Sequence, residues 1–305
     1  MSPVANTSGI RAHMKTVGSI SKITGAMQMV ASARMHQAQQ RANASLPYAD
    51  KLRGLLQLAL SDPSVMAHLD YSQNPLLEKR PVYKTAYIIM GSDKGLAGPF
   101  NNNIVKFTGV ELRGKEDSPL LTVGKQMQIG LNHWGYSIAK SWNGFSEKPT
   151  FEAAEEIADY AEAMFTHGEV DEVNIIYTYF KSAMVQLPRT IPLLPLQPKA
   201  GDKAEEDAVK VWDTQDQSDF TTLLFEPEPA QMLSYLAHYY MRSQIFTALI
   251  QSSACELAAR MTAMTTATDN AETLLGKLQV YYQKVRQASI TTEINEIVGG
   301  AEALK

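Results

Sequence analysis

The chain has 305 residues, one cysteine, 45% hydrophobic residues and a formal net charge of −4. This length leaves room for two domains, and the lone Cys255 excludes an internal disulfide framework and indicates a reducing compartment. No run approaches the ~18 consecutive apolar residues of a membrane-spanning helix, and the N-terminus lacks the apolar core of a secretory signal.

The charge is distributed unevenly. Residues 10–53 carry seven Lys/Arg against one acid, residues 54–227 carry 15 against 24, and residues 228–305 carry six against seven. A basic segment beside an acidic body favours an acidic partner for that segment. Nucleic acid and an acidic protein surface both fit this description. Residues 1–47 contain no aromatic side chain that could stack on bases, which favours the protein surface.

The first element in chain order is an N-terminal helix within residues 1–60. Gly18 and Gly25 each cost this helix roughly 1 kcal/mol against alanine, so it should lean on a neighbour. Pro47 predicts a kink or a restart. The stripe expected to face the neighbour is apolar at three- and four-residue steps: Ile10, Met14, Val17, Ile20, Ile23, Met27 and Val30.

The middle of the chain, residues 77–220, is predicted to be a small α/β domain of Rossmann-like type. Residues 85–90, 120–124 and 173–178 read as buried strands, and residues 151–166 as a helix. That helix should bury Ala154, Ile157, Ala161 and Met164 on one face. Strands that alternate with helices predict a mostly parallel sheet. Residues 194–219 are polar and predict a surface excursion.

No catalytic constellation emerges from the middle domain. The glycine-rich segment 91–101 follows a strand but lacks the Gly-Lys-Ser/Thr of a P-loop and the spacing of a dinucleotide fingerprint, so it predicts a tight strand-to-helix turn. The six histidines are scattered without metal-ligand spacing, and no Gly-x-Ser-x-Gly elbow is present. The sequence therefore predicts no catalytic, cofactor or metal site.

Residues 228–305 predict one very long helix that begins at Pro229. No proline follows for about 75 residues, and at ~1.5 Å per residue such a helix would be on the order of 110 Å long. The helix carries a periodic seam of side chains that would face a partner helix. This seam turns polar at its last two positions, Ser289 and Thr292, while the apolar residues move to Ile290, Ile294 and Ile297. Gly299-Gly300 marks the expected end. The seam alternates steps of four and three, the period of a coiled coil: Leu257, Met261, Met264, Thr268, Ala271, Leu275, Leu278, Tyr282, Val285, Ser289 and Thr292.

Two terminal helices that pair antiparallel around a separate middle give the simplest architecture. Periodicity alone also fits an ordinary helical-bundle core. The length of the C-terminal helix favours the long antiparallel coiled coil, because no compact bundle needs a helix of this size.

Motifs at both ends resemble the gamma subunit of F-type ATP synthases. Residues 22–31 (KITGAMQMVA) are similar to the N-terminal signature of that family. Residues 258–264 (AARMTAM), 267–271 (ATDNA), 286–291 (RQASIT) and 293–300 (EINEIVGG) closely resemble its C-terminal signature. The resemblance continues through SDKGLAG at 92–98, GEVDEV at 168–173 and FEP at 225–227.

This resemblance implies a central rotary shaft and not an enzyme in its own right. The paired helices would stand inside a ring of three alpha and three beta subunits, with the epsilon subunit and the membrane rotor ring at the foot. Ion-driven rotation of the shaft would drive the catalytic sites of the beta subunits through successive conformations, or the reverse on hydrolysis. No nucleic acid and no directly bound nucleotide are expected, nor any cofactor or metal.

The resemblance also implies partner contacts at Lys22, Met27, Arg260, Arg286, Gln287, Thr291 and Glu296. Arg260 could bond a carboxylate bidentately, and Gln287 and Thr291 share one helix face. Gly25, Gln28 and Ala12-His13 depart from the charges common in the family. The chain lacks the cysteine-bearing insertion of the chloroplast type and an evident transit peptide. These features predict a peripheral protein on the cytoplasmic face of a bacterial inner membrane.

Two other classes of function compete with the shaft. A nucleotide-using enzyme would need phosphate-loop chemistry that is missing. A generic coiled-coil adaptor needs only apolar spacing, and so does not account for the polar identities of AARMTAM and RQASIT.

Overall fold

The computed structural model describes residues 7–61, 70–71, 74–115, 117–196 and 229–302. The chain divides into two compact units, one made of residues 1–34 and 258–305 and the other of residues 35–257. The ranges predicted from the sequence, 1–60, 77–220 and 228–305, follow chain order, whereas each terminal helix contributes to both units. Residues 197–220 of the predicted middle domain, and with them most of the surface excursion, lie outside the described residues.

The two long terminal helices are confirmed. Helix α1 spans Thr7–Ser61 and helix α6 spans Pro229–Glu302, which are 55 and 74 residues. Helix α6 begins at the predicted proline and continues through Gly299-Gly300 to Glu302. The predicted restart at Pro47 is wrong, because α1 continues through it. Pro47 lies on the exposed side of the helix, while buried residues recur at Ala42, Ala49 and Leu52, so packing of the opposite face holds the helix together.

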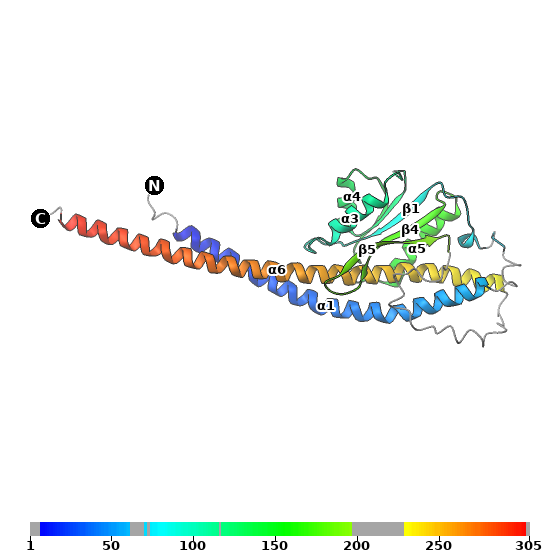
Figure 1. Ribbon diagram of the computed structural model, residues 1–305, viewed down its shortest axis with the longest axis horizontal. Coiled ribbons are helices and arrows are strands. Elements are labelled where there is room, and N and C mark those ends of the chain that lie inside the picture. Colours follow the sequence, from blue (N-terminus) through cyan, green and yellow to red (C-terminus); the bar gives the residue numbers. More distant parts are fainter. Residues whose placement is uncertain (1–6, 62–69, 72–73, 116, 197–228, 303–305) are drawn as a thin grey trace. The chain divides into compact units, whose positions relative to one another are not determined.

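In the first unit, the segments of α1 and α6 pair side by side (Figure 1). All seam positions predicted for α6 within this unit are buried or half-buried. Between residues 271 and 300, all positions of α6 that lie outside this seam are exposed. The 3.5-residue seam of the C-terminal helix is therefore confirmed, including its polar members Ser289 and Thr292.

The seam of α1 departs from the prediction after Val17. The helix continues its alternate steps of four and three through Ser21, Thr24, Gln28 and Ala31, which are buried or half-buried. The apolar residues predicted to face the neighbour are turned outward instead: Ile20 is 46% exposed, Ile23 59% and Val30 53%. The predicted stripe included three consecutive three-residue steps, which drift away from a 3.5-residue period. The coiled coil keeps that period, although the seam positions it buries here are less apolar.

The second unit contains a five-stranded sheet in the order β3-β2-β1-β4-β5. The first four strands run parallel and β5 pairs antiparallel with β4, so the mostly parallel sheet is confirmed. The predicted strands are β1 (Thr85–Met90), β2 (Leu120–Val123) and β4 (Glu172–Phe180). The sequence did not predict β3 (Ile138–Trp142) or β5 (Gln186–Leu194). Both are edge strands with much half-exposed surface, and β5 contains two prolines, which edge strands tolerate.

Helices cover the sheet on both sides (Figure 1). Helices α3 (Phe100–Glu111) and α4 (Lys125–His133) pack on one face. Helix α5 (Phe151–Thr166) packs on the other face, where its apolar residues join those of the neighbouring parts of α1 and α6 in one core. The bounds of α5 and its buried face at Ala154, Ile157, Ala161 and Met164 agree with the prediction. A one-turn 3₁₀ helix, η2 (Pro75–Leu77), packs near the end of α5.

Candidate functional site

The outer surface of the paired helices is the candidate partner-binding site of the first unit. Two cross-helix contacts fix the pairing. The Arg11 Nη2 atom donates to Tyr282 Oη at 2.6 Å, and the hydroxyl of Thr268 donates to that of Thr24 at 2.8 Å. Going from the first pair to the second, residue numbers rise in α1 and fall in α6. The two helices are therefore antiparallel, as predicted.

Most of the residues predicted to contact partners are accessible. Lys22, Arg286, Gln287, Thr291 and Glu296 are exposed, and Met27 is half-buried. The Thr291 hydroxyl donates to the Gln287 carbonyl at 3.0 Å, which places both residues on the same helix face. Arg260 differs, since it is only 6% exposed. Its bidentate contact with a partner carboxylate stays a prediction, and the guanidinium would have to be uncovered first.

The sequence pattern did not reveal a set of outward-facing apolar residues on α1. Ile20, Ile23 and Val30 on α1 lie outside the seam, whose positions here are the polar Ser21, Thr24 and Gln28. A strict alternation of four-residue and three-residue steps, counted from Ile10, was the signal that could have identified these outward-facing residues. This stretch of α1 thus has polar residues inside the pair and apolar residues outside. A helix surface of this kind is expected where a protein partner covers it.

The end of α6 shows the same outward apolar character. Ile290, Ile294 and Ile297 are 43%, 54% and 72% exposed, and residues 293–301 are all exposed. The shift of apolar residues away from the seam after Thr292 therefore leaves an uncovered apolar face on the last turns, as the sequence pattern indicated.

The glycine-rich turn after β1 is filled by its own side chains. The Asp93 carboxylate accepts from the amides of Lys125 at 3.3 Å and Ser146 at 3.0 Å. The Asn101 Oδ1 atom accepts from the Ser92 amide at 3.3 Å. Burial by itself would raise the pKa of Asp93, but amide hydrogen bonds from Gly144, Ser146 and Lys125 outweigh it and lower that pKa.

A glycine allows this turn to close. Gly124, which follows β2, has φ of +99°, and an added Cβ would lie 2.8 Å from the carbonyl oxygen of Gly91. The predicted strand-to-helix turn is confirmed, with α3 beginning at Phe100. Two amides of this turn donate to side chains: that of Ser92 to Asn101, and that of Asp93 to the Ser146 hydroxyl at 3.0 Å.

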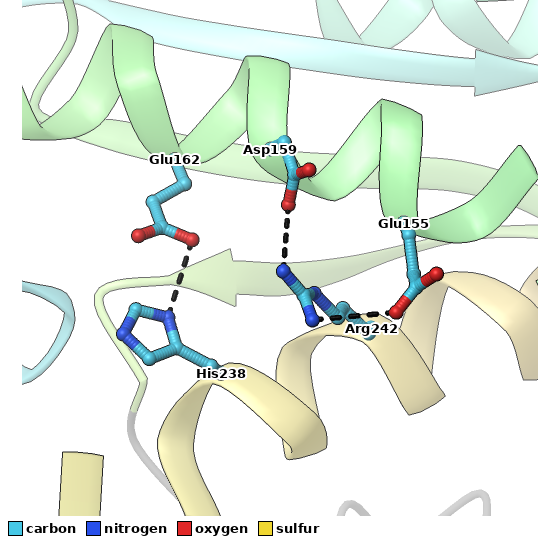
Figure 2. Close-up of polar contacts among 5 residues, drawn as sticks. All are labelled: Glu155, Asp159, Glu162, His238 and Arg242. Atoms are coloured by element: carbon cyan, nitrogen blue, oxygen red, sulfur yellow. Dashed lines mark hydrogen bonds and ion pairs between the residues drawn. The ribbon is translucent and has the colours of Figure 1, made fainter. Parts of the chain in front are cut away.

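Charged residues join α5 to the first turns of α6 within the second unit (Figure 2). The Arg242 guanidinium lies 3.3 Å from Glu155 and 2.9 Å from Asp159, and His238 lies 3.2 Å from Glu162. All five side chains are at least a fifth exposed, so each ion pair contributes little by itself. The apolar core beneath supplies most of the stability, and the charged contacts add polar links between the two helices.

The single cysteine is structural. Cys255 is fully buried, and its thiol donates to the Thr178 carbonyl at 3.4 Å. Burial raises the pKa of this thiol far above its ordinary value, which disfavours the reactive thiolate.

No group of three His, Cys, Asp or Glu side chains in the described ranges could hold a metal ion. No helix in the same ranges is both long and apolar enough to cross a membrane.

Comparison with known proteins decides the family. The sequence model of a family described as ATP synthase matches residues 6–304. The ATP synthase gamma chain of Heliobacterium modesticaldum is 36% identical over 97% of this chain and 98% of its own length. The sodium-ion-specific gamma chain of Acetobacterium woodii is also 36% identical, over 98% and 99%. This chain belongs to the ATP synthase gamma-chain family.

Solved structures of ATP synthases share the fold of this gamma-chain family member. A chain from the central stalk and c-ring of the Tetrahymena thermophila mitochondrial ATP synthase matches with a TM-score of 0.58 and 25% identity. That match covers 80% of this chain and 99% of that one. A chain from the OSCP/F1/c-ring structure of the Euglena gracilis mitochondrial enzyme matches with a TM-score of 0.65 and 17% identity, covering 98% and 94%.

The gamma-chain assignment confirms the function predicted from the terminal motifs. The chain is the central-stalk subunit of a rotary ATP synthase. A generic coiled-coil adaptor does not account for a family match that spans residues 6–304.

Proposed function

We propose that the paired helices act as a non-catalytic rotating shaft inside a ring of three alpha and three beta subunits. The observation that carries the proposal is the reversed pattern of α1 near residues 20–30, where apolar residues face outward and polar residues fill the seam. Apolar surface of this kind gains stability only when another protein covers it. A surrounding ring whose subunits take turns at the surface would provide that cover at each angle of rotation.

The chain would bind no nucleotide and would work at a membrane surface. In the turn after β1, the amides of Ser92 and Asp93 donate to side chains of the chain itself, which supports a chain that binds no nucleotide. The epsilon subunit and the membrane rotor ring would bind at the foot, on the cytoplasmic face of a bacterial inner membrane. Rotation would bias the conformations of the beta subunits through differential contacts at each angle. Lys22, Met27, Arg260, Arg286, Gln287, Thr291 and Glu296 would be among the contacts.

Reconstitution tests this proposal. The purified chain would be mixed with matching alpha and beta subunits, the product sized, and its ATP hydrolysis measured. We expect one complex with a single copy of this chain per three alpha–beta pairs, and hydrolysis that depends on the chain. No association with alpha and beta subunits that assemble with their own gamma chain would contradict it.

A matched pair of variants locates the interface. Ile23→Asp places a charge at a position that is 59% exposed, and Ile129→Asp does so at a position of α4 that is 52% exposed. Neither should unfold the chain, because both side chains already reach solvent. We expect only Ile23→Asp to weaken assembly or chain-dependent hydrolysis. Equal effects of the two variants would show that the outward face of α1 has no special role.

A further inference from the structure

A hollow of about 640 Å³ lies where α3 and α4 end, beside the beginnings of β2 and β3. Its volume is within the range of roughly 300–1,000 Å³ that is typical of small-molecule sites. It belongs to the second unit, and neither the terminal motifs nor the outer surface of the paired helices includes it. Its walls combine apolar residues such as Leu112 with aromatic and charged side chains.

One wall of the hollow is aromatic. Trp134, which is 51% exposed, and Tyr136 both line it. Gly109 of α3 makes room for them, since an added Cβ would lie 3.0 Å from Cζ3 of Trp134 and 3.7 Å from the Tyr136 hydroxyl. Aromatic faces attract cations through their quadrupole, and attract organic ammonium ions in particular.

The charges around the hollow also favour a cation. Leu112 and Trp134, the residues that cap the C-terminal ends of α3 and α4, both line it. Each helix end contributes about half a negative charge. Asp117 and Arg113, which carry opposite charges, line the hollow as well, and within the described ranges neither is joined to another residue by an ion pair. Since those two charges cancel, the helix ends leave a balance of roughly one negative charge.

We propose that this hollow binds a small organic ammonium ion, such as a quaternary ammonium or a polyamine. The cation would lie over the Trp134 ring, with Asp117 as its counter-charge, and Arg113 would limit its affinity. A divalent metal ion fits less well, because Asp117 is the only carboxylate lining the hollow among the described residues and hard cations need several oxygen ligands. This inference does not depend on the shaft function.

Fluorine NMR of the full chain labelled with 5-fluorotryptophan tests the proposal. The chain has three tryptophans, so three resonances are expected, and Trp134→Phe assigns one of them. Choline chloride would be titrated in, and sodium chloride at equal ionic strength would be the reference. We expect a saturable shift of the Trp134 resonance with choline only. The resonance of Trp142, which is 5% exposed, should not move.

Three variants test the roles of the lining residues. Asp117→Asn should weaken choline binding by about three- to fivefold, and Arg113→Gln should strengthen it by a similar factor, because each changes one unit charge near the ligand. Gly109→Ala should weaken binding while helix content is kept, since alanine favours a helix but displaces Trp134. Glu169→Gln removes an exposed carboxylate outside the hollow and should change nothing.

Each alternative outcome would overturn the proposal. One is a Trp134 resonance that does not respond to choline. Another is a response that Asp117→Asn and Arg113→Gln leave unchanged. A third is a stronger response to benzoate that Arg113→Gln abolishes, which would identify the hollow as an anion site.

Discussion

At the scale of single residues, Asp93 ties together three loops of the Rossmann-like part of this chain. Asp93 follows β1, and its carboxylate accepts from the amides of Lys125 after β2 and Ser146 after β3. The backbone N–H of Asp93 is also engaged, because it donates to the Ser146 hydroxyl at 3.0 Å.

Asp93→Asn should destabilise the chain by about 1–3 kcal/mol, because an amide NH₂ would face backbone donors. The pKa of Asp93 is lowered in the folded state, so its stabilisation is present above the unfolded-state pKa of about 4 and is lost as pH falls through the folded pKa. Urea unfolding of both proteins between pH 7 and pH 2 measures this. The difference between them should be constant near neutral pH and shrink below about pH 4. A difference that is independent of pH would show that the charge plays no part.

At the scale of elements, the long helices hold their shape through packing more than through intrinsic propensity. Helix α1 contains Gly18, Gly25 and an internal Pro47, all of which disfavour a helix. Its buried face nevertheless keeps the 3.5-residue period across this stretch and beyond it. An isolated helix of this composition would be marginal, so α1 depends on its neighbour.

Gly25→Ala should therefore stabilise the isolated chain by roughly 0.5–1 kcal/mol, because nothing lies within 4 Å of the added methyl group. Thermal unfolding followed by circular dichroism at 222 nm would measure the gain. Gly124→Ala is the matched control: it should destabilise, since φ is +99° and the methyl group would lie 2.8 Å from a carbonyl oxygen. A loss of stability in Gly25→Ala would mean that this position needs its glycine within the pair.

At the scale of the whole molecule, the two compact units have different tasks. The unit of residues 35–257 contains the sheet, the apolar core and the hollow between α3 and α4. The unit of residues 1–34 and 258–305 has little core of its own and an outer surface with exposed apolar residues. The family match spans residues 6–304 and so includes both units.

Truncation after Thr292 separates folding from function. Residues 293–301 are all exposed, so their removal costs little buried apolar surface and the remaining chain should fold with an unchanged thermal midpoint. In an assembled complex we expect weaker coupling of ATP hydrolysis to ion transport, since the outward Ile294 and Ile297 would be lost. Circular dichroism and proton or sodium pumping by reconstituted vesicles give the two readouts. Collapse of the fold would show that the last turns are a folding element.

The sequence by itself determined much of this protein. It located both long helices, the seam of α6, the start at Pro229, strands β1, β2 and β4, the bounds of α5 and the family. These features depend on local periodicity, on proline and on motif identity, which are properties of short segments. The exposed positions among the predicted partner contacts, such as Gln287 and Thr291, also follow from the period of α6 once its seam is known.

Only the tertiary structure decided the rest. Two stripes of α1 have steps of three and four beyond Val17, and only pairing with α6 selects Ser21, Thr24 and Gln28 over the more apolar Ile20 and Ile23. Burial of Arg260 and the edge strands β3 and β5 likewise depend on neighbours that are remote in sequence. The physical reason is the same in each case: local spacing states which faces an element can bury, but the packed partner determines which face it does bury.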